Sequence, residues 1–350
     1  MLNRSIALLV GVLLACGVTT ANAEESRGSH AAPTYAELPV GAPTTLPWWQ
    51  RGRLHVGGTV ISTRNSDIVS RNGTTVVAPG EERRRDHRTT SWFLVEGKRL
   101  VRLPVRAPSG PPLLSANGRW LAWLEVRARE TEDYWRIERY RTVIYDVERG
   151  RVATSFRDRR LVAWGDGING IWLRTLSNRG RLVLLQGDDG VKVLSPRGRL
   201  ARFDGPRSGY TSVDGWPRGT TVLRSGGVSV YGLVGRDGGF SRSGRFAVSF
   251  AGLWSADGRN YAYSDDSSEA PTYWVRPLDG RPVRLATPSD VPYLGVVGWE
   301  SADAVILWHF DDYSNRPTSR LVRCSATTGA CERVPGGPRP GAWATMPSRY

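Results

Sequence analysis

Two stretches of this chain share one pattern: Leu113-Leu-Ser115-Ala-Asn-Gly-Arg-Trp-Leu-Ala-Trp123 and Leu253-Trp254-Ser-Ala-Asp-Gly-Arg-Asn-Tyr-Ala-Tyr263. In each, an apolar run stops at a short polar turn that contains glycine and then resumes. Short apolar runs broken by Asn-Gly or Asp-Gly are typical of β-hairpins. The pattern therefore predicts a hairpin at each place.

The same hairpin pattern recurs along the chain at irregular intervals of about 50 residues, which is the period of propeller blades. Its further copies are Leu46–Leu54, Val162–Trp172, Val213–Leu223 and Val297–Leu307. A second hairpin pattern, with β-favouring residues around a tight turn, lies between them. Its copies are Trp92–Leu103, Thr142–Ala153, Val191–Ala201, Val228–Gly238, Tyr273–Leu285 and Ser319–Cys331.

One inner and one outer hairpin together make a four-stranded antiparallel sheet. No helix-period segment supplies the crossovers that parallel strands need. Sheets stacked radially bury both of their faces and leave only short edges. The sequence therefore predicts an all-β fold, a β-propeller of six four-stranded blades over residues 46–336, with five and seven blades as the alternatives.

Three glycine turns carry a family resemblance. Ser115-Ala-Asn-Gly-Arg119, Ser255-Ala-Asp-Gly-Arg259 and Ser241-Arg-Ser-Gly-Arg245 resemble the Ser-Pro-Asp-Gly-Arg turn of WD40-like, TolB-type propeller repeats of exported bacterial proteins. The resemblance implies the propeller fold and an exported protein. It implies no catalytic set, because the motif is a turn. The third copy has an alternative place in an outer strand.

The first residues predict a signal peptide over residues 1–23. Arg4 is followed by an apolar run, and Ala21-Asn-Ala23 is typical of a cleavage site. Leu13-Leu-Ala-Cys16 also resembles a lipoprotein box, so the alternatives are secretion and a lipid anchor at Cys16 on the outer side of the cytoplasmic membrane. Residues 24–45 are predicted to be a flexible lead, and the Pro/Gly-rich residues 337–350 a tail over the surface.

Cys324 and Cys331 are the cysteines that remain beyond the leader, and they flank a predicted hairpin tip. In an exported protein such a pair is expected to be oxidised to a disulfide. Their spacing and the lack of a histidine cluster argue against zinc, and no metal or other cofactor is predicted.

The net charge of +15 comes almost entirely from arginine, since Lys98 and Lys192 are the only lysines. The arginines are scattered through turns, which argues against a specific nucleic-acid site. The partner is left open between an unknown ligand or protein and an anionic cell-envelope polymer held by the arginine-rich face. A membrane is expected as a partner only if Cys16 is lipidated.

Propeller topology assigns the loops to two faces. Inner and outer hairpin turns share one face, and that face is predicted to be basic. Its arginines are Arg51, Arg53, Arg119, Arg149, Arg151, Arg197, Arg199, Arg218, Arg236, Arg259 and Arg281. The opposite face is predicted to mix carboxylates with aromatic rings.

The acidic and aromatic face is the predicted ligand site, because carboxylates beside aromatic rings suit a sugar, a cation or a basic peptide. Its residues are Asp133, Tyr134, Trp135, Asp265, Asp266, Asp311, Asp312 and Tyr313. By contrast, Trp164, Trp216, Trp254 and Trp299 recur at one repeat position and are predicted to pack between blades.

No residue is assigned a catalytic role, since the chain has no nucleophile elbow and no histidine pair at metal spacing. The favoured function is an exported, non-enzymatic binding or scaffold module. The alternative is a glycan-active enzyme that uses Asp265, Asp266, Asp311 and Asp312, where paired carboxylates would flank the scissile bond.

Overall fold

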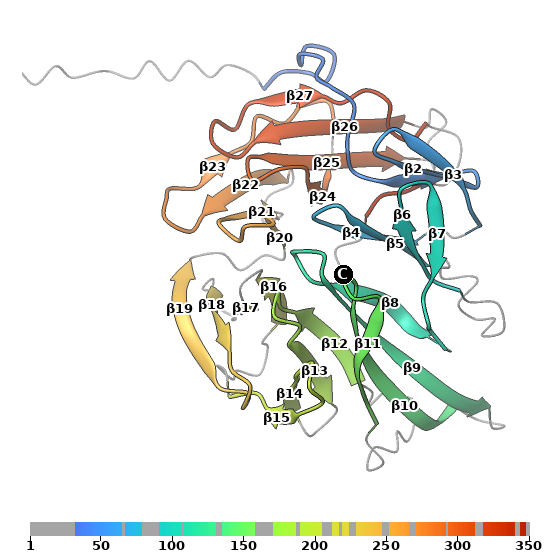
Figure 1. Ribbon diagram of the computed structural model, residues 1–350. Helices are drawn as coiled ribbons and strands as arrows, with labels where there is room; N and C mark the ends of the chain where they lie inside the picture. Colours follow the sequence, from blue (N-terminus) through green and yellow to red (C-terminus); the bar gives the residue numbers. More distant parts are fainter. Residues whose placement is uncertain are drawn as a thin grey trace, which may run out of the picture. The chain divides into compact units, whose positions relative to one another are not determined.

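The computed structural model describes residues 32–64, 67–78, 91–106, 108–130, 135–157, 171–186, 190–204, 212–216, 219–223, 229–246, 252–265, 271–291, 293–311, 318–339 and 344–347. All of the regular structure in these residues is β-strand, in antiparallel four-stranded sheets (Figure 1). Within them, no helix is long and apolar enough to span a membrane.

The strands form seven four-stranded sheets, numbered here in chain order and each written from its first strand to its last. Sheet 1 is β28 (Ala344–Thr345), β1 (Trp48–Gln50), β2 (Arg53–Val56) and β3 (Thr59–Ser62). Sheet 2 is β4 (Asp67–Arg71), β5 (Thr74–Ala78), β6 (Phe93–Glu96) and β7 (Arg99–Arg102). Sheet 3 is β8 (Pro108–Leu114), β9 (Trp120–Glu130), β10 (Trp135–Asp146) and β11 (Arg151–Phe156).

The remaining sheets follow the same order. Sheet 4 is β12 (Ile171–Leu176), β13 (Leu182–Gln186), β14 (Gly190–Leu194) and β15 (Leu200–Arg202). Sheet 5 is β16 (Ser212–Trp216), β17 (Gly219–Leu223), β18 (Ser229–Val234) and β19 (Phe240–Phe246). Sheet 6 is β20 (Gly252–Trp254), β21 (Asn260–Asp265), β22 (Thr272–Pro277) and β23 (Val283–Arg284), and sheet 7 is β24 (Gly295–Trp299), β25 (Ala304–Asp311), β26 (Thr318–Ser325) and β27 (Cys331–Arg333).

The propeller class is confirmed, and the described residues form seven blades, one of the two alternatives to the favoured six. The sequence analysis joined the hairpins at Leu46–Leu54 and Trp92–Leu103 into one blade, whereas they belong to sheets 1 and 2. The blade that was missed contains the β4–β5 hairpin, which turns at Asn72-Gly73. That Asn-Gly pair is a strong hairpin signal, and Ser70-Arg-Asn-Gly73 repeats the serine and glycine spacing of Ser115-Ala-Asn-Gly118, so the sequence contains the signal that would have located this blade.

Each sheet packs against its two neighbours in a closed circuit. The first strands of successive sheets contact one another, as in β4 with β8, β8 with β12, and β20 with β24. Among the described residues, the buried apolar side chains form clusters between adjacent sheets, and the circuit closes between sheets 7 and 1, where Ile306 and Trp48 pack together. Stacking sheets in this way buries both faces of every blade.

The recurring tryptophans pack between blades, as predicted. Trp216 is 4% exposed and packs on Trp254, and its indole N–H donates to the Gly258 carbonyl of the next sheet at 3.1 Å. Trp299 donates to the Leu253 carbonyl at 3.0 Å across the interface between sheets 7 and 6. Each of these indoles buries apolar surface between two blades and also donates a hydrogen bond from one blade to the other. Trp164 lies outside the described residues.

The chain closes the ring with a strand from its C-terminal part. β28 pairs with Trp49 and Gln50 of β1, and Met346 beside it is buried between sheets 7 and 1. β28 is only two residues long, which is too short to show a sequence pattern of its own, and it is held in place by pairing with β1. The prediction that residues 337–350 form a surface tail is therefore wrong for residues 344–347.

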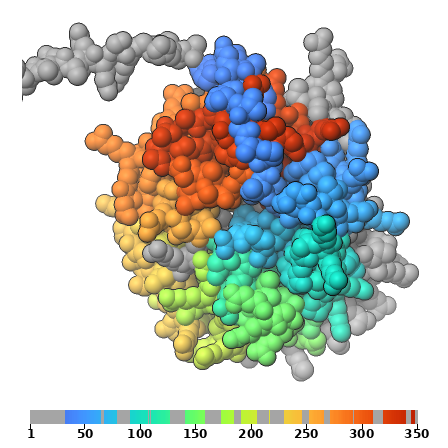
Figure 2. All heavy atoms as spheres, turned by 45° about the horizontal axis from the view of Figure 1, so that its top comes forward, coloured from blue at the N-terminus to red at the C-terminus, as the bar shows by residue number. Residues whose placement is uncertain are grey.

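The described part of the lead also packs on the ring. Leu38 is buried in the core of sheets 6 and 7, and Val40 forms a parallel bridge with Arg333 of β27. The Gly41 N–H donates to the Arg333 carbonyl at 2.8 Å. Residues 32–45 are thus an ordered strap along sheet 7, and the prediction of a flexible lead is wrong for them. Figure 2 shows these blue residues against the red C-terminal sheet.

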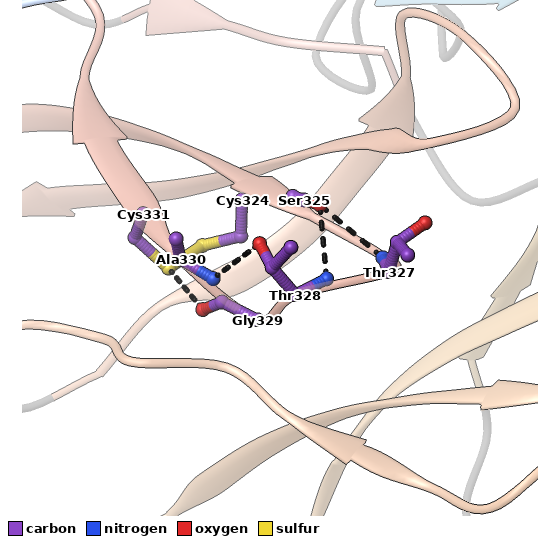
Figure 3. Close-up of a disulfide and its surroundings, with 7 residues drawn as sticks. All are labelled: Cys324, Ser325, Thr327, Thr328, Gly329, Ala330 and Cys331. Carbon is purple, nitrogen blue, oxygen red and sulfur yellow. Dashed lines mark hydrogen bonds between the residues drawn. A yellow bond between two sulfur atoms is a disulfide. The ribbon is translucent and has the colours of Figure 1, made fainter.

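The predicted disulfide joins Cys324 and Cys331, which face each other across β26 and β27 (Figure 3). The turn between them holds Gly329, whose carbonyl accepts the Ala286 N–H of sheet 6 at 2.8 Å. The bridge therefore fixes a turn that also contacts the neighbouring blade.

We expect reduction of this disulfide to destabilise the protein by about 2–3 kcal/mol, because the bridge removes loop-closure entropy from the unfolded chain. Denaturant unfolding with and without reductant measures the difference. The Cys324→Ser/Cys331→Ser variant should have the unfolding midpoint of the reduced protein, and reductant should not change that midpoint. Equal midpoints for the oxidised and reduced wild type would contradict the expectation.

Gly180 lies where two blades approach closely. Its φ of +72° is in the left-handed region, and a Cβ on it would lie 2.7 Å from the Trp120 ring of sheet 3. We expect Gly180→Ala to destabilise the protein by about 1–3 kcal/mol, from backbone strain and overpacking together.

Gly97→Ala is the matched control for this substitution, since Gly97 also has a positive φ of +58° but has no atom within 4 Å of the place that a Cβ would occupy. Gly97→Ala should lower the free energy of unfolding by about 1 kcal/mol, from backbone strain alone. Thermal unfolding measures both variants. An equal loss in the two would show that the contact with Trp120 contributes nothing.

Candidate functional site: an arginine hollow on the turn face

The inner hairpin turns of neighbouring sheets lie side by side, as predicted for a common face. The Asn72 side chain donates to the Asn117 carbonyl at 3.2 Å, and the Asn117 N–H donates to the Asn178 side chain at 2.8 Å. Across the ring, the Asn260 side chain donates to the Ala302 carbonyl at 2.9 Å. These contacts join turns of sheets 2, 3 and 4 and of sheets 6 and 7, and we call the surface they share the turn face.

A buried serine organises each of several turns on this face. Ser115 is fully buried, its Oγ accepts the Trp120 N–H at 2.9 Å, and its carbonyl accepts the Gly118 N–H at 2.8 Å. The same turn is built on Ser177, Ser195 and Ser255. Serine and glycine therefore hold the backbone, and the arginine that follows the glycine projects from the turn.

The turns of sheets 3, 4 and 5 surround a hollow of about 510 Å³ that is lined chiefly by arginine. We call it the arginine hollow. The arginines that line it are Arg119, Arg149, Arg151, Arg179, Arg181, Arg197 and Arg236. They come from inner and outer hairpin turns of consecutive blades, so the hollow exists only because the blades stack.

Among the described residues of this lining, Asp146 is the single carboxylate, and it already forms ion pairs. Its side chain is 1% exposed and lies 3.3 Å from an Arg119 nitrogen and 3.6 Å from an Arg149 nitrogen. Arg119 also pairs with the exposed Glu148 at 3.1 Å. One end of the hollow is therefore neutralised by protein groups.

The other end has no such compensation. Arg151, Arg179 and Arg197 are exposed and form no ion pair within the described part of the chain. Arg181 is half-buried, and its guanidinium donates to the Val234 carbonyl of sheet 5.

The pKa of Arg181 is lowered by burial first and then by the positive charges of Arg179 and Arg236, which outweigh the opposing effect of Asp237. A guanidinium stays protonated at neutral pH all the same. Burial and the neighbouring positive charges both disfavour the charged form of Arg181, so an anion bound beside it would stabilise that charge.

The sequence analysis found part of this set. Arg119, Arg149, Arg151, Arg197 and Arg236 were assigned to the basic face, and the structure brings them together.

Arg179 and Arg181 were missed, because the third inner hairpin was placed at Val162–Trp172, of which only the last residues are described. Ser177-Asn-Arg-Gly180-Arg181 repeats the serine-glycine-arginine spacing and is the signal that would have located that hairpin.

Arg51 and Arg53 were assigned to the wrong face. Because β28 occupies the first position in sheet 1, the β1–β2 turn joins the second and third strands and lies at the opposite end of the sheet. Arg259 and Arg281 lie in turns of sheet 6 and do not line the hollow. Arg218 lies outside the described residues.

The predicted acidic and aromatic site falls mostly outside the described residues. Those outside are Asp133, Tyr134, Asp266, Asp312 and Tyr313. Trp135 begins β10 and Asp311 ends β25, but their side chains are not among those described. Asp265 ends β21 and is half-buried. The acidic and aromatic site therefore stays a prediction.

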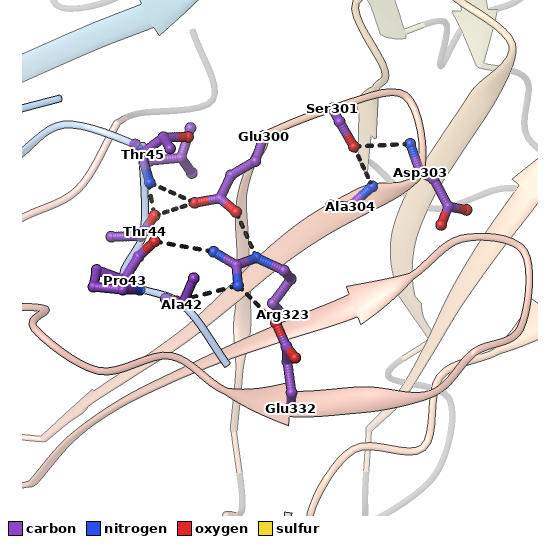
Figure 4. A network of polar contacts seen from close by, with 11 residues as sticks. Ala42, Pro43, Thr44, Thr45, Glu300, Ser301, Asp303, Ala304, Arg323 and Glu332 are labelled. Atoms are coloured by element: carbon purple, nitrogen blue, oxygen red, sulfur yellow. Dashed lines mark hydrogen bonds and ion pairs between the residues drawn. The ribbon is translucent and has the colours of Figure 1, made fainter. Parts of the chain in front are cut away.

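A second hollow, of about 530 Å³, opens on the turn face between sheets 1, 2, 3, 6 and 7. We call it the axial hollow. Trp254 and Trp299 form part of its wall beside Leu46 and Pro47, which directly follow the strap. Glu300 lies at its edge and is the centre of a polar network (Figure 4).

The Glu300 network ties the strap to sheet 7. One carboxylate oxygen accepts hydrogen bonds from the Thr44 hydroxyl and the Thr45 N–H, each at 2.6 Å, and the other accepts Arg323 Nε at 2.6 Å. Arg323 also donates to the Pro43 carbonyl at 3.2 Å. The two charged groups are therefore saturated by each other and by the strap, so they are structural and leave little capacity for a ligand.

The similarity of this chain to known proteins is confined to solved structures of low sequence identity. No family model matches the chain, and no curated protein matches it. Among solved structures, it is similar to TolB from Acinetobacter baumannii, with 15% identity and a TM-score of 0.41 over 72% of this chain and 61% of that chain. It is also similar to the β-propeller domain of the trilobed protease from Pyrococcus furiosus, with 15% identity and a TM-score of 0.48 over 78% and 85%.

The chain therefore spans less than two thirds of the TolB chain that it matches.

The Glu300 network predicts a specific acid sensitivity. Burial by itself would raise the pKa of Glu300, but hydrogen bonds from Arg323, Thr44 and Thr45 outweigh it and hold the pKa below its usual value. The stability that Glu300 contributes is therefore fully present above the ordinary glutamate pKa of about 4.3 and is lost as the pH falls through the lowered folded value.

We expect Glu300→Gln to be less stable at neutral pH by about 1–3 kcal/mol and to lose less stability on acidification. Urea unfolding at pH 7 and at a series of pH values below 4.5 measures both effects. Glu96→Gln, at an exposed carboxylate, is the control and should follow the wild type. Parallel pH profiles for Glu300→Gln and the wild type would rule out the expected role of Glu300.

Proposed function

We propose that this chain is an exported binding module whose turn face holds an anionic polymer of the cell envelope. The observation that carries the proposal is the arginine hollow, where seven arginines and a single, already paired carboxylate line one space. Unpaired guanidinium groups attract anionic chains and bind their oxygens through paired N–H donors.

The exported location is supported by two features. The leader at residues 1–23 has the charge and apolar run of a signal peptide. The Cys324–Cys331 disulfide is of the kind that persists in oxidising compartments outside the cytoplasm. Secretion and a lipid anchor at Cys16 both place the turn face where envelope polymers occur.

A binding role is favoured because the described residues that line the arginine hollow include no histidine or cysteine and no unpaired carboxylate to act as a general base. The guanidinium groups of the lining are donors that remain charged at all physiological pH values. Such a lining holds an anion without changing it, so a scaffold or tether fits the hollow better than a hydrolase.

The test is the salt dependence of polymer binding. Protein that begins at residue 24 is applied to immobilised polyphosphate, to a polyuronate and to neutral dextran in 50–300 mM NaCl, values chosen to span the usual range of screening. We expect retention on the anionic polymers that falls steeply with salt, and no retention on dextran. Salt-independent retention, or none at 50 mM, would eliminate the proposal.

A triple variant locates the binding. Arg151→Gln/Arg179→Gln/Arg197→Gln removes exposed guanidinium groups from both walls of the hollow. We expect binding to weaken about 10- to 100-fold and the slope of log affinity against log salt to fall by about 2–3, one unit for each lost contact.

The matched control is Arg102→Gln/Arg242→Gln/Arg284→Gln, which removes the same charge from exposed positions on outer strands of sheets 2, 5 and 6. It should retain most of the binding. An equal loss in both triple variants would mean that net charge alone drives retention and that the hollow is not the site.

A further inference from the structure

We propose that the arginine hollow is a discrete site for a chain of adjacent phosphoryl groups, held between the turns of sheets 3 and 4. This inference rests on the proposed function and narrows its ligand from anionic polymers in general to those that are dense in phosphate.

The hollow has two walls with guanidinium groups on each. Arg149 and Arg151 come from the outer turn of sheet 3, while Arg179 and Arg197 come from the inner and outer turns of sheet 4. All four side chains are exposed. A ligand between the walls is therefore approached by donors from two sides, which a flat surface patch does not offer.

The floor of the hollow carries a charge as well. Arg181 is half-buried, and its bond to the Val234 carbonyl of sheet 5 holds the guanidinium in place. Because Arg179 and Arg236 stand near it, the positive charges repel one another while the hollow is without a ligand. A multiply charged anion lowers that repulsion between several guanidinium groups at once. Its binding free energy is therefore more favourable than the sum of its separate contacts with each guanidinium group.

Charge density then selects the class of anion. The hollow measures about 510 Å³, the size of a small-molecule site. A polyuronate carries one negative charge per sugar ring. A phosphoryl chain carries one charge on each internal group and up to two on a terminal group, and its adjacent groups lie within a few ångströms of one another, so its charge per unit length is higher. The fork of a guanidinium also fits two oxygens of one phosphoryl group.

The rest of the lining disfavours the other sources of phosphate. Trp120, the aromatic residue of the lining, is 8% exposed, so it offers no open face on which a nucleic-acid base would stack. Val152 is the only large apolar side chain of the lining that is exposed among the described residues, which is too little to enter a membrane. The hollow thus suits a phosphoryl chain in water.

Calorimetric titration with inorganic tripolyphosphate tests the inference directly. Mellitate, a compact hexacarboxylate, carries at least as much negative charge without phosphoryl groups, and orthophosphate provides a single phosphoryl group. We expect one tripolyphosphate per protein, bound at least about tenfold more tightly than either of the others. Equal or tighter binding of mellitate would overturn the inference.

Variants assign the binding to the hollow. Arg179→Gln/Arg197→Gln should weaken tripolyphosphate at least about tenfold, while the control Arg242→Gln/Arg284→Gln should leave it within about twofold. Thermal unfolding of each variant verifies that it is folded. An equal loss in the two double variants would overturn the inference.

Competition separates the sources of phosphate. Polyphosphate should displace tripolyphosphate, whereas single-stranded DNA and vesicles that contain phosphatidic acid should compete at least about tenfold less well per phosphate. Stronger competition by DNA or vesicles would overturn the inference.

The failure of this inference is distinguishable from the failure of the proposed function. Retention on polyuronate and polyphosphate with equal strength and equal salt dependence would leave the proposed function standing and remove the preference for phosphate. No retention on either polymer at 50 mM NaCl would remove both, under the same conditions of screening.

Discussion

The packing of each four-stranded sheet against a neighbour on both sides is the constraint on which the rest of the structure depends. A single such sheet has two apolar faces and cannot cover both by itself. The circuit closes where Trp48 of sheet 1 packs on Ile306 of sheet 7 and where β28 supplies the first strand of sheet 1. Without that closure, the first and last blades would each expose an apolar face to water.

The same stacking creates the candidate site. Arg151, Arg179 and Arg197 lie in turns of two different sheets, and nothing in their local sequence brings them together. Buried serines fix the turns, and adjacent blades then set the turns side by side. The hollow is therefore a product of the packing between blades, and its charge is a product of which residues each turn carries. Conserving the turn geometry while varying the exposed turn residues would change the ligand and keep the fold.

Much of the fold could be predicted from the hairpins, because alternating apolar residues and glycine turns are local properties of the chain. The blade count was missed even though Ser70-Arg-Asn-Gly73 of the β4–β5 hairpin repeats the serine and glycine spacing of Ser115-Ala-Asn-Gly118. The count also depends on β28, which completes sheet 1 from the other end of the chain. The two ends were also predicted wrongly for the residues that the structure describes. The strap around Val40 and the strand β28 have little pattern of their own, because their partners are edges of sheets that already exist.

The sequence by itself determined the all-β class, the hairpins, the Cys324–Cys331 pairing and the packing role of Trp216, Trp254 and Trp299, because each depends on residues close in the chain or on a repeated position. Tertiary structure alone decided which arginines share a hollow. Arg51 lies on the opposite face, while Arg181, which the sequence analysis overlooked, forms the floor. The physical reason is that the face of a turn depends on the position of its strands within the sheet, and closure by β28 shifts that position for sheet 1.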